Sequence, residues 1–268
     1  MVTETHRLTA VPVAQRKLAT EQAAALAFVA ALVGAEILGE LTSVVAGAAV
    51  DGVVLLVLLN AALLGLVRPA SLLPPVLALV PLMRILSVAL PMRQASQLSW
   101  YVLVGVPLLL GIALAARTVG HERPARRSRW ATVPVQVIVA ALGVPLGMVA
   151  YSTLHPAPIQ PLTARGVVLA TVVLFLFAAL VEELIFRRLL QDVVVRLFGT
   201  AGVVLVSVLY AATFAGSLSA RYVVLMGVVG LGFAFAVRWT GALWGAVAAH
   251  TLLLVGLLVV WPALGVPY

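Results

Sequence analysis

The sequence predicts an all-α protein, a polytopic transmembrane helical bundle of about eight to nine spans with its N-terminus in the cytoplasm. Composition is the first reason, since 63% of the 268 residues are hydrophobic and only 10% are charged. A soluble domain is roughly half apolar, and the mean hydropathy of +1.18 lies well above that class. The other two reasons are the lengths of the apolar segments and the placement of basic residues between them.

Nine apolar segments approach the length of about 20 residues that a helix needs to cross a hydrocarbon core. A helix also satisfies its own backbone groups in lipid. We expect spans at residues 22–41, 48–67, 70–91, 98–116, 132–152, 166–186, 200–216, 222–237 and 241–261. The first segment is similar to a secretory signal cleaved after Ala35, but the eight segments that follow favour an uncleaved span.

Basic residues predict the orientation, because cytoplasmic loops are enriched in Lys and Arg. With a cytoplasmic N-terminus, thirteen of the 17 basic residues fall on the inner side, and Arg84 falls within the third span. The formal charge of +8 is thus an orientation signal, and its scatter over short loops argues against a nucleic-acid partner. The inner residues are Arg7, Arg16, Lys17, Arg68, Arg117, Arg123, Arg126, Arg127, Arg129, Arg187, Arg188, Arg196 and Arg238, and the outer ones are Arg93, Arg165 and Arg221.

The order of segments divides the chain into three regions. Residues 1–21 form a cytoplasmic tail, residues 22–131 a four-helix membrane region ending in a basic loop, and residues 132–268 a five-helix membrane region. The loop RTVGHERPARRSRWA, residues 117–131, is typical of a solvated segment beside anionic lipid, with a specific partner site as the alternative. The absence of cysteine excludes a disulfide framework and a cysteine nucleophile.

The stretch FAALVEELIFRRLLQD, residues 177–192, places two adjacent glutamates near the predicted cytoplasmic end of the sixth span. An ionised side chain in a membrane helix costs about 2.5–3.5 kcal/mol on insertion scales, so it needs a partner or a function. Glu183 has Arg187 at i,i+4, which predicts a local ion pair. Glu182 has Phe186 at that spacing, so the helix itself does not explain it.

Two motifs carry a resemblance to a known family. EELIFR contains Glu182, Glu183 and Arg187 and matches the pattern EExxxR, and GLGFAFAVRWTGALWGAVAAH, residues 230–250, ends on His250. In this order and spacing they resemble the CAAX protease and bacteriocin-processing (CPBP) family of intramembrane endopeptidases. The resemblance covers about residues 166–256.

The resemblance implies a membrane cavity facing the cytoplasm, in which Glu182 is the general base for a water that attacks a peptide carbonyl. Glu183 and Arg187 would support the helix end. His250 would help to bind the carbonyl oxygen or the water, with a hydrogen bond between helices as the alternative. No cofactor and no metal are expected, because a catalytic zinc site takes about three protein ligands.

The sequence departs from the family pattern at two positions. The family has FxxxH on the next helix, where this chain has Tyr210 and Phe214, and HxxxN on the last, where it has Leu254 after His250. Tyr210 shares a helical face with Phe214, so its hydroxyl is a candidate to approach the same cavity.

Four further charged residues lie in the predicted N-terminal spans: Glu36, Glu40, Asp51 and Arg84. Glu36 and Arg84 fall at similar depth and can pair. A buried salt bridge that fixes the first three helices is one interpretation, and a proton or ion pathway is the other.

Three functions stay open from the sequence. The first is an endopeptidase that hydrolyses a peptide bond with a water activated by a glutamate. The second is a catalytically inactive relative that binds a membrane peptide or partner helix, and the third is a transporter. The partners would be the lipid bilayer and a membrane-embedded or lipidated peptide. The Ala, Val, Leu and Arg content is compatible with a bacterial plasma membrane.

Overall fold

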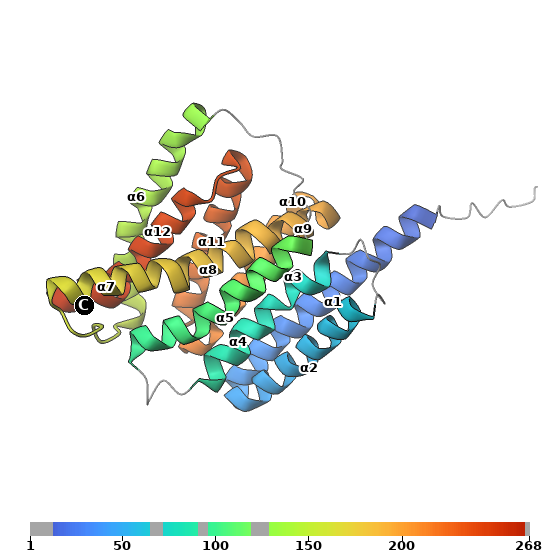
Figure 1. Ribbon diagram of the computed structural model, residues 1–268, viewed down its shortest axis with the longest axis horizontal. Helices are drawn as coiled ribbons and strands as arrows, with labels where there is room; N and C mark the ends of the chain where they lie inside the picture. Colours follow the sequence, from blue (N-terminus) through green and yellow to red (C-terminus); the bar gives the residue numbers. More distant parts are fainter. Residues whose placement is uncertain (1–12, 65–71, 91–95, 119–128, 266–268) are drawn as a thin grey trace, which may run out of the picture.

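The protein is a bundle of helices in the computed structural model, which describes residues 13–64, 72–90, 96–118 and 129–265 (Figure 1). All regular secondary structure within these ranges is helical. Eight helices are long and apolar enough to cross a membrane. The all-α polytopic fold is therefore confirmed, and the protein is an integral multi-pass membrane protein. The cytoplasmic placement of the N-terminus stays a prediction.

The N-terminal region contains five helices. They are α1 (Val13–Leu41), α2 (Val44–Leu63), α3 (Leu73–Leu77), α4 (Leu79–Ala89) and α5 (Gln97–Thr118). The third predicted span is shorter than expected, because α3 and α4 together cover only Leu73–Ala89. α1 and α2 pack closely near the turn between them, where a Cβ on Gly47 would lie 2.7 Å from the Ala35 carbonyl oxygen.

The C-terminal region begins with α6 (Arg129–Leu154) and continues into one long helical run. That run consists of α7 (Ala164–Leu174), the π-helical η1 (Phe175–Ala179), α8 (Leu180–Glu183), the π-helical η2 (Leu184–Leu190) and α9 (Gln191–Phe198). After it come α10 (Thr200–Ala212), the 3₁₀ turn η3 (Ala215–Ser217), α11 (Ala220–Thr240), α12 (Trp244–Val255), the π-helical η4 (Gly256–Val260) and α13 (Trp261–Leu264).

The long run corrects the predicted end of the sixth span. The helix does not stop at residue 186 but continues to Phe198, for 35 residues in all. At 1.5 Å per residue it is about 52 Å long, well beyond a hydrocarbon core of about 30 Å. Hydropathy falls at Arg187 and Arg188, but the helix continues as the amphipathic α9 and ends at Gly199, whose φ is 59°. Glu182 and Glu183 therefore lie in the middle of a helix.

Two π-helical segments, η1 and η2, lie on either side of α8. A π-helical turn adds a residue to the turn and changes the direction of the side chains that follow it. Such turns occur often at functional sites, and here they flank the four residues that end in the glutamate pair.

α12 lies directly against α6, and the two are side by side in Figure 1. Glycines on α6 make this approach possible. A Cβ on Gly143 would collide with the carbonyl oxygen of Ala249, and a Cβ on Gly147 would lie 2.9 Å from that of Leu253. Both contacts are within one turn of His250, so they fix the position of its backbone.

Gln136 of α6 clamps the turn between α11 and α12. Its side-chain amide donates to the Thr240 hydroxyl at 2.6 Å and to the Ala242 carbonyl at 3.2 Å, and its carbonyl accepts from the Gly245 N–H at 2.6 Å. Gln136 is fully buried, and its bonds to Thr240 and Gly245 are closed off from water, so no water can replace the side chain there.

Replacing Gln136 by leucine is expected to destabilise the protein by about 2–4 kcal/mol, because it removes three buried hydrogen bonds and leaves the Gly245 N–H unpaired. The measurement is the thermal unfolding midpoint in detergent. Asn60→Leu is the control, since Asn60 is exposed and bonds only within its own helix. Equal midpoints for the two variants would show that the clamp does not hold the turn.

Candidate functional site

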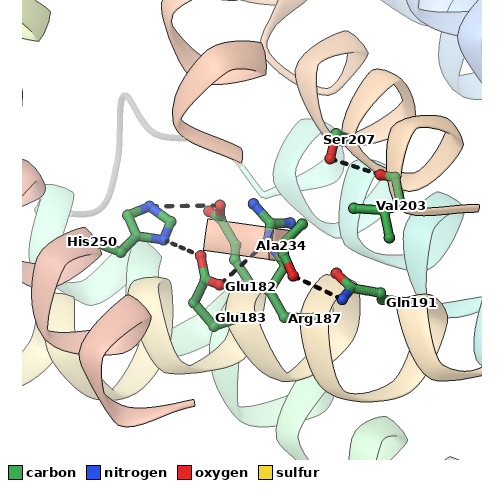
Figure 2. Close-up of polar contacts among 8 residues, drawn as sticks. All are labelled: Glu182, Glu183, Arg187, Gln191, Val203, Ser207, Ala234 and His250. Carbon is green, nitrogen blue, oxygen red and sulfur yellow. Dashed lines mark hydrogen bonds and ion pairs between the residues drawn. The ribbon is translucent and has the colours of Figure 1, made fainter. Parts of the chain in front are cut away.

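The candidate site lies where the long helical run meets α10 and α12. Glu182 and Glu183 end α8, Arg187 follows in η2, and His250 comes from α12 (Figure 2). Tyr210 enters from α10. The structure thus brings together all five residues that the sequence analysis selected.

The imidazole of His250 reaches both carboxylates, as Figure 2 shows. Its Nδ1 forms a hydrogen bond of 3.0 Å with Glu183 Oε1, whereas its Nε2 is 3.8 Å from Glu182 Oε2, too far for a hydrogen bond. In the tautomer with hydrogen on Nδ1, that N–H donates to Glu183 and the lone pair of Nε2 faces Glu182. The contact with Glu183 was not predicted, because only helix packing brings α12 to α8.

Glu183 also forms the ion pair that its spacing to Arg187 predicts. Arg187 Nε is 3.4 Å from Glu183 Oε2, and both side chains are fully buried. Glu183 therefore contacts a guanidinium through one oxygen and an imidazole through the other. Removing one partner of such a buried pair leaves a charge without compensation, which is strongly destabilising.

The guanidinium of Arg187 lies over the ring of Tyr210, with its Cζ 4.1 Å from the ring centroid. This cation–π contact partly compensates for the Nη atoms, which have no hydrogen-bond partner among the described residues. Gly230 of α11 leaves the space for it, because a Cβ there would lie 2.6 Å from Tyr210 Cδ1 and 3.1 Å from Arg187 Nη2.

Glu182 is the one carboxylate of the site that reaches the protein surface. Its side chain is 22% exposed, against 0% for Glu183 and 1% for His250. The two adjacent glutamates therefore have different environments, one closed within the bundle and one open on one side.

The Tyr210 hydroxyl is buried and faces the Glu182 carboxylate. It forms no hydrogen bond of ordinary geometry with any described residue. The ring is held by Phe186 and Phe214, each 5.0 Å away between centroids, and stands edge-on to His250 at 6.5 Å. The Tyr210 hydroxyl is thus fixed beside the partly exposed Glu182.

The two positions that depart from the family pattern hold apolar side chains. Phe214 packs on Tyr210 and also on Tyr222, at 5.6 Å between ring centroids. Leu254 is buried one turn after His250. Tyr210 offers a hydroxyl one turn before Phe214, the position at which the resemblance implies a histidine.

Three residues near the site were not predicted. Gln191 donates from its amide to the Ala234 carbonyl at 3.0 Å and ties the long run to α11 (Figure 2). Its i+4 spacing from Arg187 was a usable signal. Tyr101 of α5 and Tyr222 of α11 lie within electrostatic reach of Glu182, and nothing in their sequence spacing connects them to it.

The N-terminal charges form a second, separate cluster. Arg84 pairs with Glu36, as the sequence analysis expected. Glu36 and Arg84 line a small cavity together with the buried Asp51, and Glu40 is exposed at its edge.

Comparison with known proteins gives one family. Residues 164–255 match the family described as Rce1-like, type II CAAX prenyl endopeptidase Rce1-like. No curated protein and no solved structure gave a match. The matched segment agrees with the range of about residues 166–256 expected from the motifs, and it contains Glu182, Tyr210 and His250. The membrane segment that holds this site is therefore similar to the family described as type II CAAX prenyl endopeptidase Rce1-like.

Proposed function

We propose that the protein is an intramembrane endopeptidase in which Glu182 activates the attacking water. One observation carries the proposal: His250 is fixed by a hydrogen bond to the buried Glu183 and presents its second nitrogen to the partly exposed Glu182. A base must reach its proton directly or through one water, and Glu182 is the site carboxylate that water can approach.

The water has to bind on the exposed side of Glu182. A water that bridges two groups by hydrogen bonds of about 2.8 Å holds them roughly 4.5–5.5 Å apart. The separation of 3.8 Å between Glu182 and His250 is too short for that. Glu182 would take one proton from this water while the water oxygen attacks the carbonyl carbon of the peptide bond. Glu182 would later return that proton to the leaving amine nitrogen as the C–N bond breaks.

Tyr210 is the donor best placed for the negative oxygen that develops on the attacked carbonyl. Its hydroxyl hydrogen has no other partner among the described residues, and it faces Glu182. A fixed donor in a water-poor site stabilises such an oxygen far more than it would in water. Tyr210 would thus supply the hydrogen-bond donor that the apolar Phe214 and Leu254 cannot provide.

The position of the site supports a membrane substrate. Glu182 lies in the middle of a helix long enough to cross the membrane, so a peptide bond that reaches it belongs to a membrane-embedded or lipidated peptide. The second candidate function is a catalytically silent protein that binds such a peptide at the same place. The apolar Phe214 and Leu254 favour that alternative, since each replaces a polar group of the family pattern.

Replacing Glu182 by glutamine is expected to lower cleavage of a membrane peptide library by about 10²–10⁴-fold, because the amide cannot take a proton. The assay is cleavage by the full-length protein in liposomes. Glu21→Gln, on α1, is the control and should leave the rate unchanged. Full activity of Glu182→Gln would refute the proposed base, and peptide binding without cleavage by the unaltered protein would support the silent alternative.

Replacing Tyr210 by phenylalanine is expected to lower kcat by about 10²–10³-fold with little change in KM, because the lost hydroxyl acts on the developing oxygen. The thermal midpoint should not fall, since the hydroxyl has no hydrogen bond to lose. Tyr151→Phe, on α6, is the matched control. An unchanged kcat would assign Tyr210 a packing role only.

Replacing Arg187 by glutamine is expected to destabilise the protein by about 3–5 kcal/mol, because Glu183 loses its buried counter-charge. The neighbouring Arg188 pairs with Asp192 at 3.2 Å on the surface, so Arg188→Gln should cost only about 0.2–1 kcal/mol. Thermal unfolding of both variants in one detergent makes the comparison. Similar losses would mean that the Glu183–Arg187 pair does not support the site.

A further inference from the structure

A small cavity lies between α1, α2, α4 and η3, away from the candidate site. It has a volume of about 20 Å³, which is room for one water-sized group. Its wall includes Glu36 and Glu40 of α1, Asp51 of α2, Arg84 of α4 and Gly216 of η3. These are the titratable and charged groups that face the cavity, and η3 contributes none.

The polar atoms around this cavity are incompletely paired. Arg84 forms an ion pair with Glu36 Oε1, but Glu36 Oε2 is buried without a hydrogen-bond partner among the described residues. Asp51 is only 4% exposed and lines the cavity, and within the described part of the chain it has no hydrogen bond or ion pair. Two buried carboxylates thus face a space that no protein atom fills.

The charges of the cavity do not balance. Glu36 and Asp51 would bring two negative charges into the membrane helices, and Arg84 brings one positive charge. A buried ion without a counter-charge carries a large desolvation penalty. One further positive charge removes it. Within the described residues no group of three or more His, Asp or Glu side chains is arranged to hold a metal ion. The positive charge that fits two carboxylates is therefore a proton.

We propose that this cavity is a proton-binding site, in which Asp51 and Glu36 share one proton beside Arg84. Glu40, exposed at the edge, gives water a polar route to it. The proton neutralises the excess carboxylate, and its release leaves Arg84 attracted by two carboxylates. The site is independent of the proposed peptidase, because its residues come from different helices than Glu182 and His250.

Infrared difference spectroscopy of the full-length protein in lipid nanodiscs tests the proposal, since a protonated carboxyl has its own C=O stretch. Glu182→Gln serves as the background, which removes the exposed glutamate of the other site. At neutral pH this protein should show one buried carboxylic acid band that disappears at alkaline pH. Asp51→Asn and Glu36→Gln should each abolish the band, because one carboxylate and one guanidinium then balance without a proton.

Arg84→Gln and Glu40→Gln are two further variants for the same measurement. Arg84→Gln should roughly double the band, since both carboxylates then need a proton, and Glu40→Gln should leave it unchanged. Each is a near-isosteric change, and either Asp51→Asn or Glu36→Gln decides the result if the other fails to fold. A missing band, or a band that survives both substitutions, overturns the proposal. A missing band with a thermal midpoint that rises with sodium concentration would assign the cavity to an alkali cation instead.

Discussion

The buried Glu183 carboxylate is the group on which the arrangement of the candidate site depends. One of its oxygens binds the His250 imidazole at 3.0 Å, and the other lies 3.4 Å from the Arg187 guanidinium. Three helical segments therefore meet at one ionisable side chain that is fully closed off from water. Because each partner would be left with an unpaired polar group if Glu183 moved, the relative positions of α8, η2 and α12 are tightly constrained.

The rest of the C-terminal region supports that meeting point. Glycines on α6 allow α12 to approach closely, Gln136 fixes the turn that precedes α12, and Gly230 leaves space for the stacked Arg187 and Tyr210. Flanking π-helical turns set the direction of the side chains that leave α8. Small residues and backbone irregularities thus place the charged groups, while the large apolar residues fill the remaining core.

The fold class and the pair of Glu183 and Arg187 could be predicted from the sequence because those signals are local. Hydropathy reports span-length helices directly, and the i,i+4 spacing reports the pair of Glu183 and Arg187. Sequence reasoning missed the continuation of the helix to Phe198, because an amphipathic helix loses mean hydropathy while keeping its structure. It also missed the hydrogen bond from His250 to Glu183 and the clamp at Gln136, since both join residues far apart in the chain and depend on how closely the helices pack.

Two adjacent glutamates can serve different purposes only if their surroundings differ, and a helix provides that difference through the angle between successive side chains. Neighbouring positions point about 100° apart, so one carboxylate faces the interior of the bundle while the next lies at its edge. Glu183, the interior one, has its charge compensated by Arg187 and orients His250. Glu182, at the edge, is partly exposed and lies 3.8 Å from His250, and one side of its carboxylate stays open. The apolar Phe214 and Leu254 do not disturb this division, because the partners of Glu183 are His250 and Arg187. Tyr210 is the side chain whose hydroxyl lies beside Glu182.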